Sequence, residues 1–427
     1  MKKLIFVLIA ALGVSCTSYA QMTEKELKKA VKAAQKTVKE ARNDLENEAI
    51  MNKSNAKRLM DQAVKNPLLQ DWDETWVQAA AVYETYYRNE NEKSYTGGLD
   101  TVAMYNYLDK FVQYVMKADS IQQIPNAKGK ISDGARKRFG VSVHNNLTQF
   151  ISGGIFYFNH RVDYKMAYYY FDKYFTLAQT DFLKDYMVED YTWNNDRTTY
   201  AYYPALAAYN FGDYEKTLKY AKIAQEGEEY GNDATQFVCE CYGNLKDTVN
   251  WLASLKDGLV KYPTEEWYYN KLLVYYNDKG DMSELETFVE DMIKIDPEKS
   301  YNYYVLGYVA QQSENWDKAI EQYKIAIEKD PNLADAYNNL GLCIIQKADA
   351  EMESKSNLDY RSAAYKKAIQ AHKDQLEVAL PYFIKLRELE PGSVGKWGIP
   401  LQNIYYQLDK RKELDEVEAR MKSAGLI

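Results

Sequence analysis

The residue types that most often do chemistry are few and scattered in this chain. Its histidines are His144, His160 and His372, and their separations match no metal-ligand spacing. Cys239 and Cys241 are two residues apart on a predicted helix, so their side chains point to different faces and favour neither a zinc site nor a mutual disulfide. The sequence also has no Gly-Lys phosphate loop, HExxH pair or GxSxG elbow. We therefore predict no catalytic site, no metal site and no cofactor.

Tyrosine is abundant, with 40 copies against 13 Phe and 7 Trp. Because a tyrosine combines apolar area with a hydroxyl group, it suits both packing interfaces and binding surfaces. The elements that position these rings are helices. Between Ser300 and Pro331, apolar residues recur at steps of three and four, which predicts two helices with one apolar stripe each. Such a hairpin cannot bury its outer face alone and must stack on copies of itself.

Copies are indicated by the phase of the prolines, because Pro263, Pro297 and Pro331 are 34 residues apart (297 − 263 and 331 − 297). The stretch from Ser300 resembles one complete tetratricopeptide repeat (TPR), whose pattern falls on Tyr303, Leu306, Gly307, Ala319, Tyr323, Ala326 and Pro331. This resemblance implies an all-α fold, a right-handed α-solenoid of eight or nine helix pairs. It also implies protein interaction as the class of activity.

The repeat phase divides the chain into segments. We expect a signal peptide at 1–20, an N-terminal helical hairpin at 21–70, divergent helix pairs at 71–197, four regular 34-residue units at 198–331, a unit with an insertion at 332–393, and a C-terminal capping pair at 394–427. The insertion is 26 residues, since Pro331 and Pro391 are 60 apart and 60 − 34 = 26. It occupies 345–378, where both helices should overshoot their neighbours. We also expect a polar loop at Glu90–Gly98, and either a loop or an added helix at Thr180–Asp196.

The N-terminus reads as a secretory signal. Lys2 and Lys3 precede an apolar run, Leu4–Val14, which is too short to span a bilayer, and Ser18-Tyr19-Ala20 follows as a cleavage sequence. A lipid anchor at Cys16 is less favoured, because the usual Leu three residues before the cysteine is absent. We therefore expect an exported chain, periplasmic or secreted. Its net charge of −8 and lack of a concentrated basic patch argue against nucleic acid as a partner.

Candidate binding residues come from the resemblance. In TPR proteins, positions 2, 5, 9, 12 and 13 of each first helix line a concave groove that holds an extended peptide or a partner helix. The positions that we select here are Thr199, Tyr202, Tyr209, Trp267, Asn270, Tyr301, Tyr304, Tyr308, Gln312 and Asn338. We expect Tyr301, Tyr304 and Tyr308 to form a continuous ladder of rings, and Tyr303 to face the core.

The predicted function is that of an exported TPR scaffold that binds a protein or peptide partner through this aromatic, amide-rich groove. The groove positions carry no Lys or Arg, so a carboxylate clamp for a C-terminus is not expected. The alternative is a glycan-binding helical-repeat protein of the cell envelope, in which exposed rings stack on sugars and amides meet hydroxyls. An enzyme is not expected.

Overall fold

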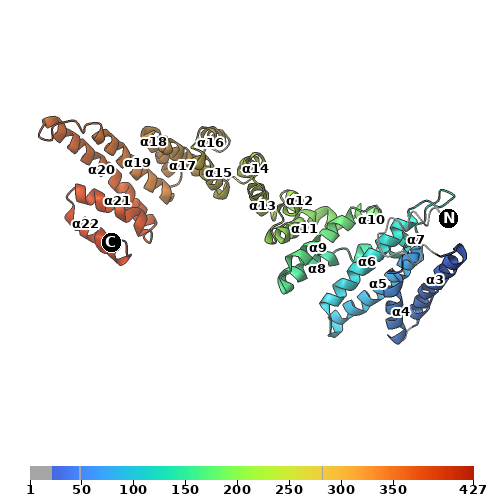
Figure 1. Ribbon diagram of the computed structural model, residues 1–427. Coiled ribbons are helices and arrows are strands. Elements are labelled where there is room, and N and C mark those ends of the chain that lie inside the picture. Colours follow the sequence, from blue (N-terminus) through green and yellow to red (C-terminus); the bar gives the residue numbers. More distant parts are fainter. Residues whose placement is uncertain (1–21, 48–49, 281) are drawn as a thin grey trace. The chain divides into compact units, whose positions relative to one another are not determined.

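The part of the chain that the computed structural model describes, residues 22–47, 50–280 and 282–427, is helical and contains no strand. Figure 1 shows helix following helix within each of two compact units. Unit 1 extends to Trp251, and unit 2 runs from Leu252 to Ile427. The predicted signal peptide lies outside the described residues. The all-helical fold class is confirmed.

Unit 1 opens with a long hairpin and continues with packed pairs. Its elements are α3 (Glu24–Glu46), α4 (Ile50–Ala63), the 3₁₀ turn η1 (Pro67–Leu69), α5 (Asp73–Thr96), α6 (Thr101–Gln122), α7 (Gly134–Asn145), α8 (Gln149–Phe156), the π-helical η2 (Tyr157–Arg161), α9 (Tyr164–Ala178), α10 (Lys184–Met187), α11 (Tyr191–Asn210), α12 (Tyr214–Ala224) and α13 (Gly231–Asn244).

The helices of unit 2 are more even in length, apart from one long pair. They are α14 (Thr248–Lys261), which contains the boundary between the units, α15 (Glu266–Lys279), α16 (Ser283–Ile295), α17 (Ser300–Gln312), α18 (Trp316–Lys329), α19 (Ala334–Glu353), α20 (Ala363–Leu389), α21 (Val394–Gln407) and α22 (Arg411–Ser423). Helices α15, α17 and α19 begin 34 residues apart (300 − 266 and 334 − 300).

Each pair packs through a small residue on its first helix. A Cβ atom on Gly307 of α17 would come within 2.7 Å of the Tyr323 ring on α18. A Cβ atom on Gly341 of α19 would come within 2.5 Å of the Phe383 ring on α20. Because both rings are fully buried, the glycines fix how closely the two helices of each pair approach.

The turn inside a pair has a repeated form. Gly212 and Glu314 both have positive φ, 77° and 55°, and each precedes an Asx residue that caps the second helix. The caps are Asp213, which accepts from the Lys216 amide at 3.0 Å, and Asn315, which accepts from the Lys318 amide at 3.3 Å. A left-handed residue followed by an Asx cap reverses the chain and starts the next helix in three residues.

The loop predicted at Glu90–Gly98 is wrong, because α5 continues to Thr96. The polar run Glu90–Ser94 stays helical since Glu90 is buried and its carboxylate is fully used: it pairs with Lys93 at 2.8 Å and accepts from the Asp100 amide, before α6, at 2.7 Å. At Thr180–Asp196, where a loop or an added helix was expected, the structure has the short helix α10 and the first turns of α11.

The inserted segment lengthens both helices of one pair. α19 has 20 residues and α20 has 27, and their overhanging turns pack through the small residues Ala348 and Ala368. His372 on α20 lies 2.7 Å from Asp349 on α19, which links the two helices near the base of the overhang. The tip between Glu353 and Ala363 is exposed apart from Lys355 and Ser362.

Candidate partner-binding surface

The ten predicted binding residues lie in two sets. Thr199, Tyr202 and Tyr209 are on α11 of unit 1, and the other seven are on α15, α17 and α19 of unit 2. All ten belong to the first helices of their pairs, and each set is described within its own unit.

In unit 1, the two predicted tyrosines belong to a stack of four half-buried rings, which we call the unit 1 ring stack. Tyr202 stacks on Tyr230 with centroids 4.3 Å apart, and on Phe237 of α13 at 5.7 Å. Tyr209 stacks on the other side of Phe237 at 4.9 Å. Thr199 is half-buried one turn before Tyr202. The sequence analysis missed Tyr230 and Phe237; Phe237 occupies position 6 of its unit, outside the groove pattern.

In unit 2, the predicted ladder Tyr301–Tyr304–Tyr308 is only partly formed. Tyr301 stacks on Tyr304 at 5.4 Å. However, Tyr301 also meets Tyr269 of α15 edge-on at 5.1 Å, and Tyr304 meets Tyr323 of α18 at 5.8 Å. The rings therefore run from helix to helix through the packing interface, rather than along one exposed face. Tyr308 makes no ring contact with the other described tyrosines.

Two expectations about exposure are corrected. Tyr301, predicted to face the partner, is only 8% exposed, because α15 packs over it and Asn270 accepts a hydrogen bond from its hydroxyl at 3.0 Å. Tyr303, predicted to face the core, is only half-buried. Its hydroxyl donates to the Pro297 carbonyl at 3.0 Å, and the Lys329 ammonium lies 5.3 Å from the centre of its ring. The 3.6-residue period places the helix face but does not fix which ring a neighbouring helix covers.

A polar network holds the half-buried Tyr304 in place. The Asn339 amide donates to the hydroxyls of Tyr304 and Tyr323 at 3.4 and 3.3 Å. Tyr323 in turn donates to Gln311 at 2.8 Å. Burial, aided by the negative charge of Asp335, raises the pKa of Tyr304 to about 12. Tyr304 is thus a structural residue, neutral at physiological pH, and Asn339 is a supporting residue that the sequence analysis missed.

What remains available to a partner in unit 2 is a row of apolar side chains at position 9 of three successive first helices. This unit 2 row consists of Val274, Tyr308 and Leu342, which are 34 residues apart along the chain (308 − 274 and 342 − 308). Val274 is 62% exposed, and Tyr308 and Leu342 are half-buried. Burial raises the pKa of the Tyr308 hydroxyl.

Polar and aromatic groups flank the row. Asn270 and Gln312 are exposed, while Asn338 is half-buried and donates to Asn339 at 3.1 Å. Trp267 is half-buried with the Lys271 ammonium 5.0 Å from its ring centre. On the next first helix, α21, Tyr406 is 67% exposed at position 13, a groove position that the sequence analysis did not include.

One charge pair also lies near this surface. Lys396 of α21 lies 2.9 Å from Asp335 of α19 and 3.2 Å from Glu390. Hydrogen bonds from these two carboxylates raise the pKa of Lys396. The pair links neighbouring first helices, and because its charges neutralise each other it leaves the row without a strong electrostatic preference.

Two hollows occur in unit 1. A cavity of 810 Å³ between α9 and the α11–α12 turn is lined by rings and charges, among them Tyr168, Asp172, Phe211 and Lys216. Lys216 lies 5.7 and 5.8 Å from the centres of the Tyr168 and Phe211 rings. Burial works against ionisation of Asp172, but hydrogen bonds from Lys219 and Tyr220 outweigh it and lower the pKa of that carboxyl.

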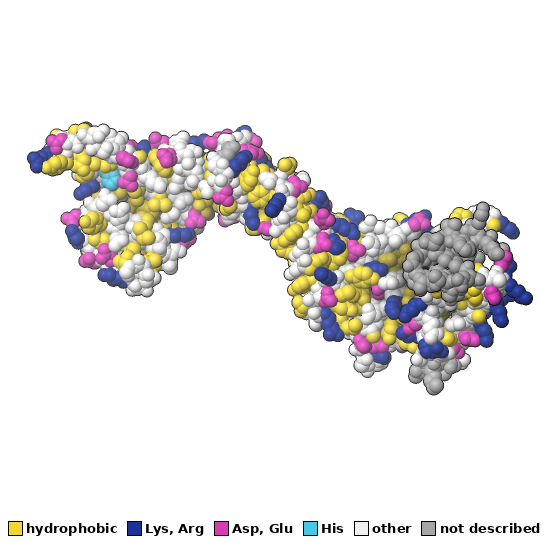
Figure 2. Space-filling model, viewed as in Figure 1, with side chains coloured by type: hydrophobic (Ala, Val, Ile, Leu, Met, Phe, Trp, Pro, Cys, Tyr) yellow, Lys and Arg dark blue, Asp and Glu magenta, His cyan; other side chains and the backbone are white. Residues whose placement is uncertain are grey.

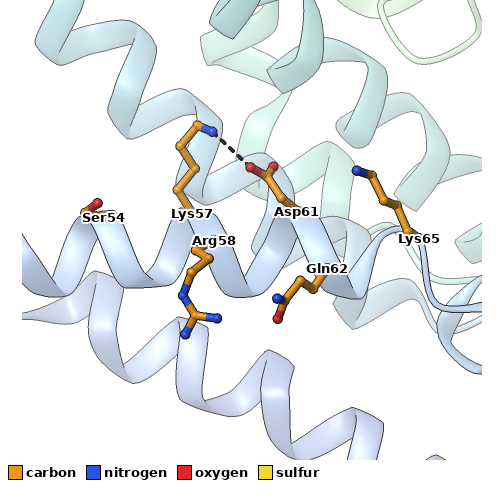
Figure 3. A pocket seen from close by; sticks show the side chains of 6 residues that line it. All are labelled: Ser54, Lys57, Arg58, Asp61, Gln62 and Lys65. Atoms are coloured by element: carbon orange, nitrogen blue, oxygen red, sulfur yellow. Dashed lines mark hydrogen bonds and ion pairs between the residues drawn. The ribbon is translucent and has the colours of Figure 1, made fainter.

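The second hollow, of 370 Å³, lies on α4 and is mainly basic (Figure 3). Lys57 points toward Asp61, 2.9 Å away, whereas Arg58 and Lys65 pair with no carboxylate of the described residues. Although burial opposes it, hydrogen bonds from Tyr83 and Lys57 hold the pKa of Asp61 below its usual value. The hollow therefore keeps a net positive charge.

Features of other site classes were also sought among the described residues. No three His, Cys, Asp or Glu side chains there come together in a way that could hold a metal ion. Within the same ranges, no helix has the length and apolarity to cross a bilayer. Cys239, Cys241 and Cys343 are buried free thiols, and burial raises the pKa of Cys241 and of Cys343 to about 12.

Comparison with known families identifies the repeat. A family profile described as TPR repeat matches residues 307–343, which run from the first helix of one pair into that of the next. Together with the paired helices, this match makes the chain a TPR repeat protein. No curated protein sequence is significantly similar to it.

Several solved structures are similar at low identity. A TPR repeats protein from Bacteroides fragilis is 18% identical, with 64% of this chain and 98% of that one covered and a TM-score of 0.33. The C-terminal part of a TPR repeat-containing protein from Cytophaga hutchinsonii is 14% identical over 63% and 92%, with a TM-score of 0.37. MamA from Desulfovibrio magneticus is 18% identical over 47% and 98%, with a TM-score of 0.29.

Proposed function

We propose that the protein is an exported TPR scaffold that binds an extended segment of a protein partner across the first helices of unit 2. TPR proteins generally act in protein–protein interaction, and the observation that supports this surface is the unit 2 row. Val274, Tyr308 and Leu342 are apolar, at least partly accessible, and repeated at the same position of successive helices. A row of this kind offers one contact per repeat.

The spacing of the row suggests what kind of segment it fits. Packed helices lie roughly 8–10 Å apart, and an extended peptide rises about 3.3 Å per residue. One side chain in every three of the peptide would therefore meet a row member. The amides of Asn270, Gln312 and Asn338 flank the row and are suited to the peptide's backbone groups. We infer a ligand with apolar residues at i, i+3 and i+6 and little need for charge.

Glycan binding is the second candidate, and it rests on the 810 Å³ cavity of unit 1. There Tyr168, Phe211 and Tyr214 stand beside Asp172 and Lys216, a mixture of rings and hydrogen-bonding groups that suits a sugar. This candidate uses a different unit and different residues, so the two functions can be separated by substitution.

Export belongs to the same proposal. Cleavage after Ala20 would leave a mature chain beginning at Gln21, without a lipid on Cys16. The intact mass of the protein recovered from its native cells measures this. A chain that retained residues 1–20, or that began at a lipid-modified Cys16, would contradict the proposal.

The binding proposal is tested by selecting from a displayed library of random peptides against the full chain, beside a glycan array. Peptides with the i, i+3, i+6 apolar pattern should be enriched and should be lost with the double variant Val274→Ala, Tyr308→Ala. The matched control is Tyr95→Ala with Val249→Ala, which removes the same residue types where they are 89% and 79% exposed on unit 1. Only the row variant should lose the peptides.

The glycan candidate predicts a different outcome. Array binding that survives the row variant and disappears with Phe211→Ala would favour it. Peptides that bind the row variant and the wild type equally would show that the row is not the site.

A further inference from the structure

Five lysines form a straight stripe along α3. Lys25, Lys29, Lys32, Lys36 and Lys39 follow one another at steps of 4, 3, 4 and 3 residues, and all five are exposed. At 100° per residue these positions lie within about 80° of one another around the helix, and at 1.5 Å per residue they cover about 21 Å of its length. We call this set the lysine stripe.

The fold requires the stripe to face solvent. The residues on the opposite side of α3 form its apolar seam, in which Val38 and Ala41 are buried, and α3 packs against α4 and α5. Because the stripe and the seam lie on opposite sides of one helix, packing of the seam leaves the stripe outward. In Figure 1 α3 is the outermost helix of unit 1, and Figure 2 shows dark blue side chains gathered at that end of the unit.

The stripe concentrates positive charge in an otherwise acidic chain. Residues 22–47 and 50–66 contain 11 Lys and Arg against 6 Asp and Glu, a net charge of +5 (11 − 6), whereas the whole chain carries −8. Within the stripe only Lys36 has an ion pair in the described residues, with Glu40 at 3.3 Å, and both side chains are at least half exposed. The basic hollow on α4 keeps the same sign on the neighbouring helix (Figure 3).

We propose that the lysine stripe docks the protein on an anionic phospholipid surface. A straight row of separate ammonium groups complements a plane of phosphates, whereas Arg in a bidentate geometry would indicate a single phosphate site. Each lysine near such a surface adds roughly a fivefold gain in partitioning. The Debye length of about 8–10 Å screens the acidic remainder of the chain. Before cleavage, Lys25 follows Val14 by 11 residues, at most about 40 Å of chain.

Vesicle sedimentation tests this with the full chain, using phosphatidylcholine vesicles with and without phosphatidylglycerol. The test variant replaces all five stripe lysines by Gln. The matched control replaces five exposed lysines elsewhere, Lys128, Lys130, Lys366, Lys367 and Lys412, and so changes the net charge equally. Every variant keeps Leu4–Val14, and the neutral vesicles measure any binding that this run causes. Thermal melting verifies that both variants fold.

We expect the stripe variant to partition at least about tenfold less onto anionic vesicles, with the control within about twofold of wild type. Binding should also weaken strongly between about 0.1 M and 1 M salt, where the Debye length falls from about 10 to 3 Å. Equal loss in both variants, or no preference of the wild type for anionic vesicles, would overturn the proposal. Equally strong, stripe-dependent binding to duplex DNA or polyglutamate would show a general polyanion site and overturn the lipid assignment.

Discussion

At the scale of single residues, two glycines at equivalent positions show how little space a helix pair leaves. Gly341 lies against the buried Phe383 ring, and Gly307 lies in the same way against Tyr323. The sequence pattern marked Gly307 as a close-approach position, because a small residue there precedes an aromatic 16 positions later (323 − 307). The structure gives the reason, which is that any Cβ atom would collide with the ring.

The first prediction concerns this collision. Gly341→Ala should destabilise the protein by roughly 1–3 kcal/mol, because a methyl group forces a buried ring to move in a packed core. Gly395→Ala on α21 is the control, since no atom lies within 4 Å of its added Cβ; it should cost nothing or stabilise slightly. Urea unfolding of both variants measures the difference. A neutral Gly341→Ala would show that the pair has slack that the structure does not indicate.

The second prediction is a loss of stability in alkali. Burial raises the pKa of Tyr87 to about 12, above the value of about 10 for a tyrosine in the unfolded chain. The unfolded state therefore releases a proton that the folded state keeps. The stabilisation is complete below pH 10 and is lost as the pH rises through 12, by up to about 1.4 kcal/mol per pH unit for one such tyrosine.

Tyr87→Phe separates this effect from general alkaline damage. It removes the hydroxyl that donates to Asn146 at 2.8 Å, so stability at neutral pH should fall by about 1 kcal/mol. Its dependence on pH between 10 and 12 should become shallower. Tyr95→Phe, at a site 89% exposed, should leave the slope unchanged. An identical slope in all three proteins would rule out Tyr87 as a contributor.

At the scale of elements, the starts of helices were more predictable than their ends and contacts. Helix α17 begins at Ser300, where the repeat pattern begins, because caps and prolines are local signals. The end of α5 was not predictable: whether the polar run after Glu90 is helix or loop depends on the hydrogen bond between Glu90 and Asp100, ten residues later. In the same way, Tyr301 and Tyr303 are adjacent in sequence pattern and differ only in what α15 covers.

The third prediction concerns the overhang of α19 and α20. Between Ala350 and Gln370 only Ala368 is buried, so these residues contribute little to the core of unit 2. Replacing them by a short Gly-Asn turn should lower the melting temperature by less than about 3 °C, which corresponds to roughly 1 kcal/mol. A large drop in the melting curve would make the overhang a packing element. If it is instead a docking arm, the shortened protein stays folded and loses a partner.

At the scale of the whole molecule, the class of protein could be predicted from sequence and the site only in part. The 34-residue phase and the absence of catalytic motifs indicated a helical repeat scaffold, since both are visible without tertiary contacts. The unit 2 row emerged only from the structure, because it is the remainder after Tyr301 and Tyr304 are used in packing. The lysine stripe was readable from its spacing, but its significance depended on knowing that the opposite face of α3 is buried.

The most direct measurement of the central claim is photocrosslinking at the unit 2 row. With p-benzoylphenylalanine in place of Tyr308, illumination should link the chain to a selected peptide at one of its apolar i, i+3, i+6 positions, and the same should hold at Leu342. The same amino acid at position 95, where the native tyrosine is 89% exposed on unit 1, should give no crosslink. Crosslinks at 308 and 342 but not at 95 are the predicted result. Crosslinking at 95, or none at the row while the peptide stays bound, would contradict the account.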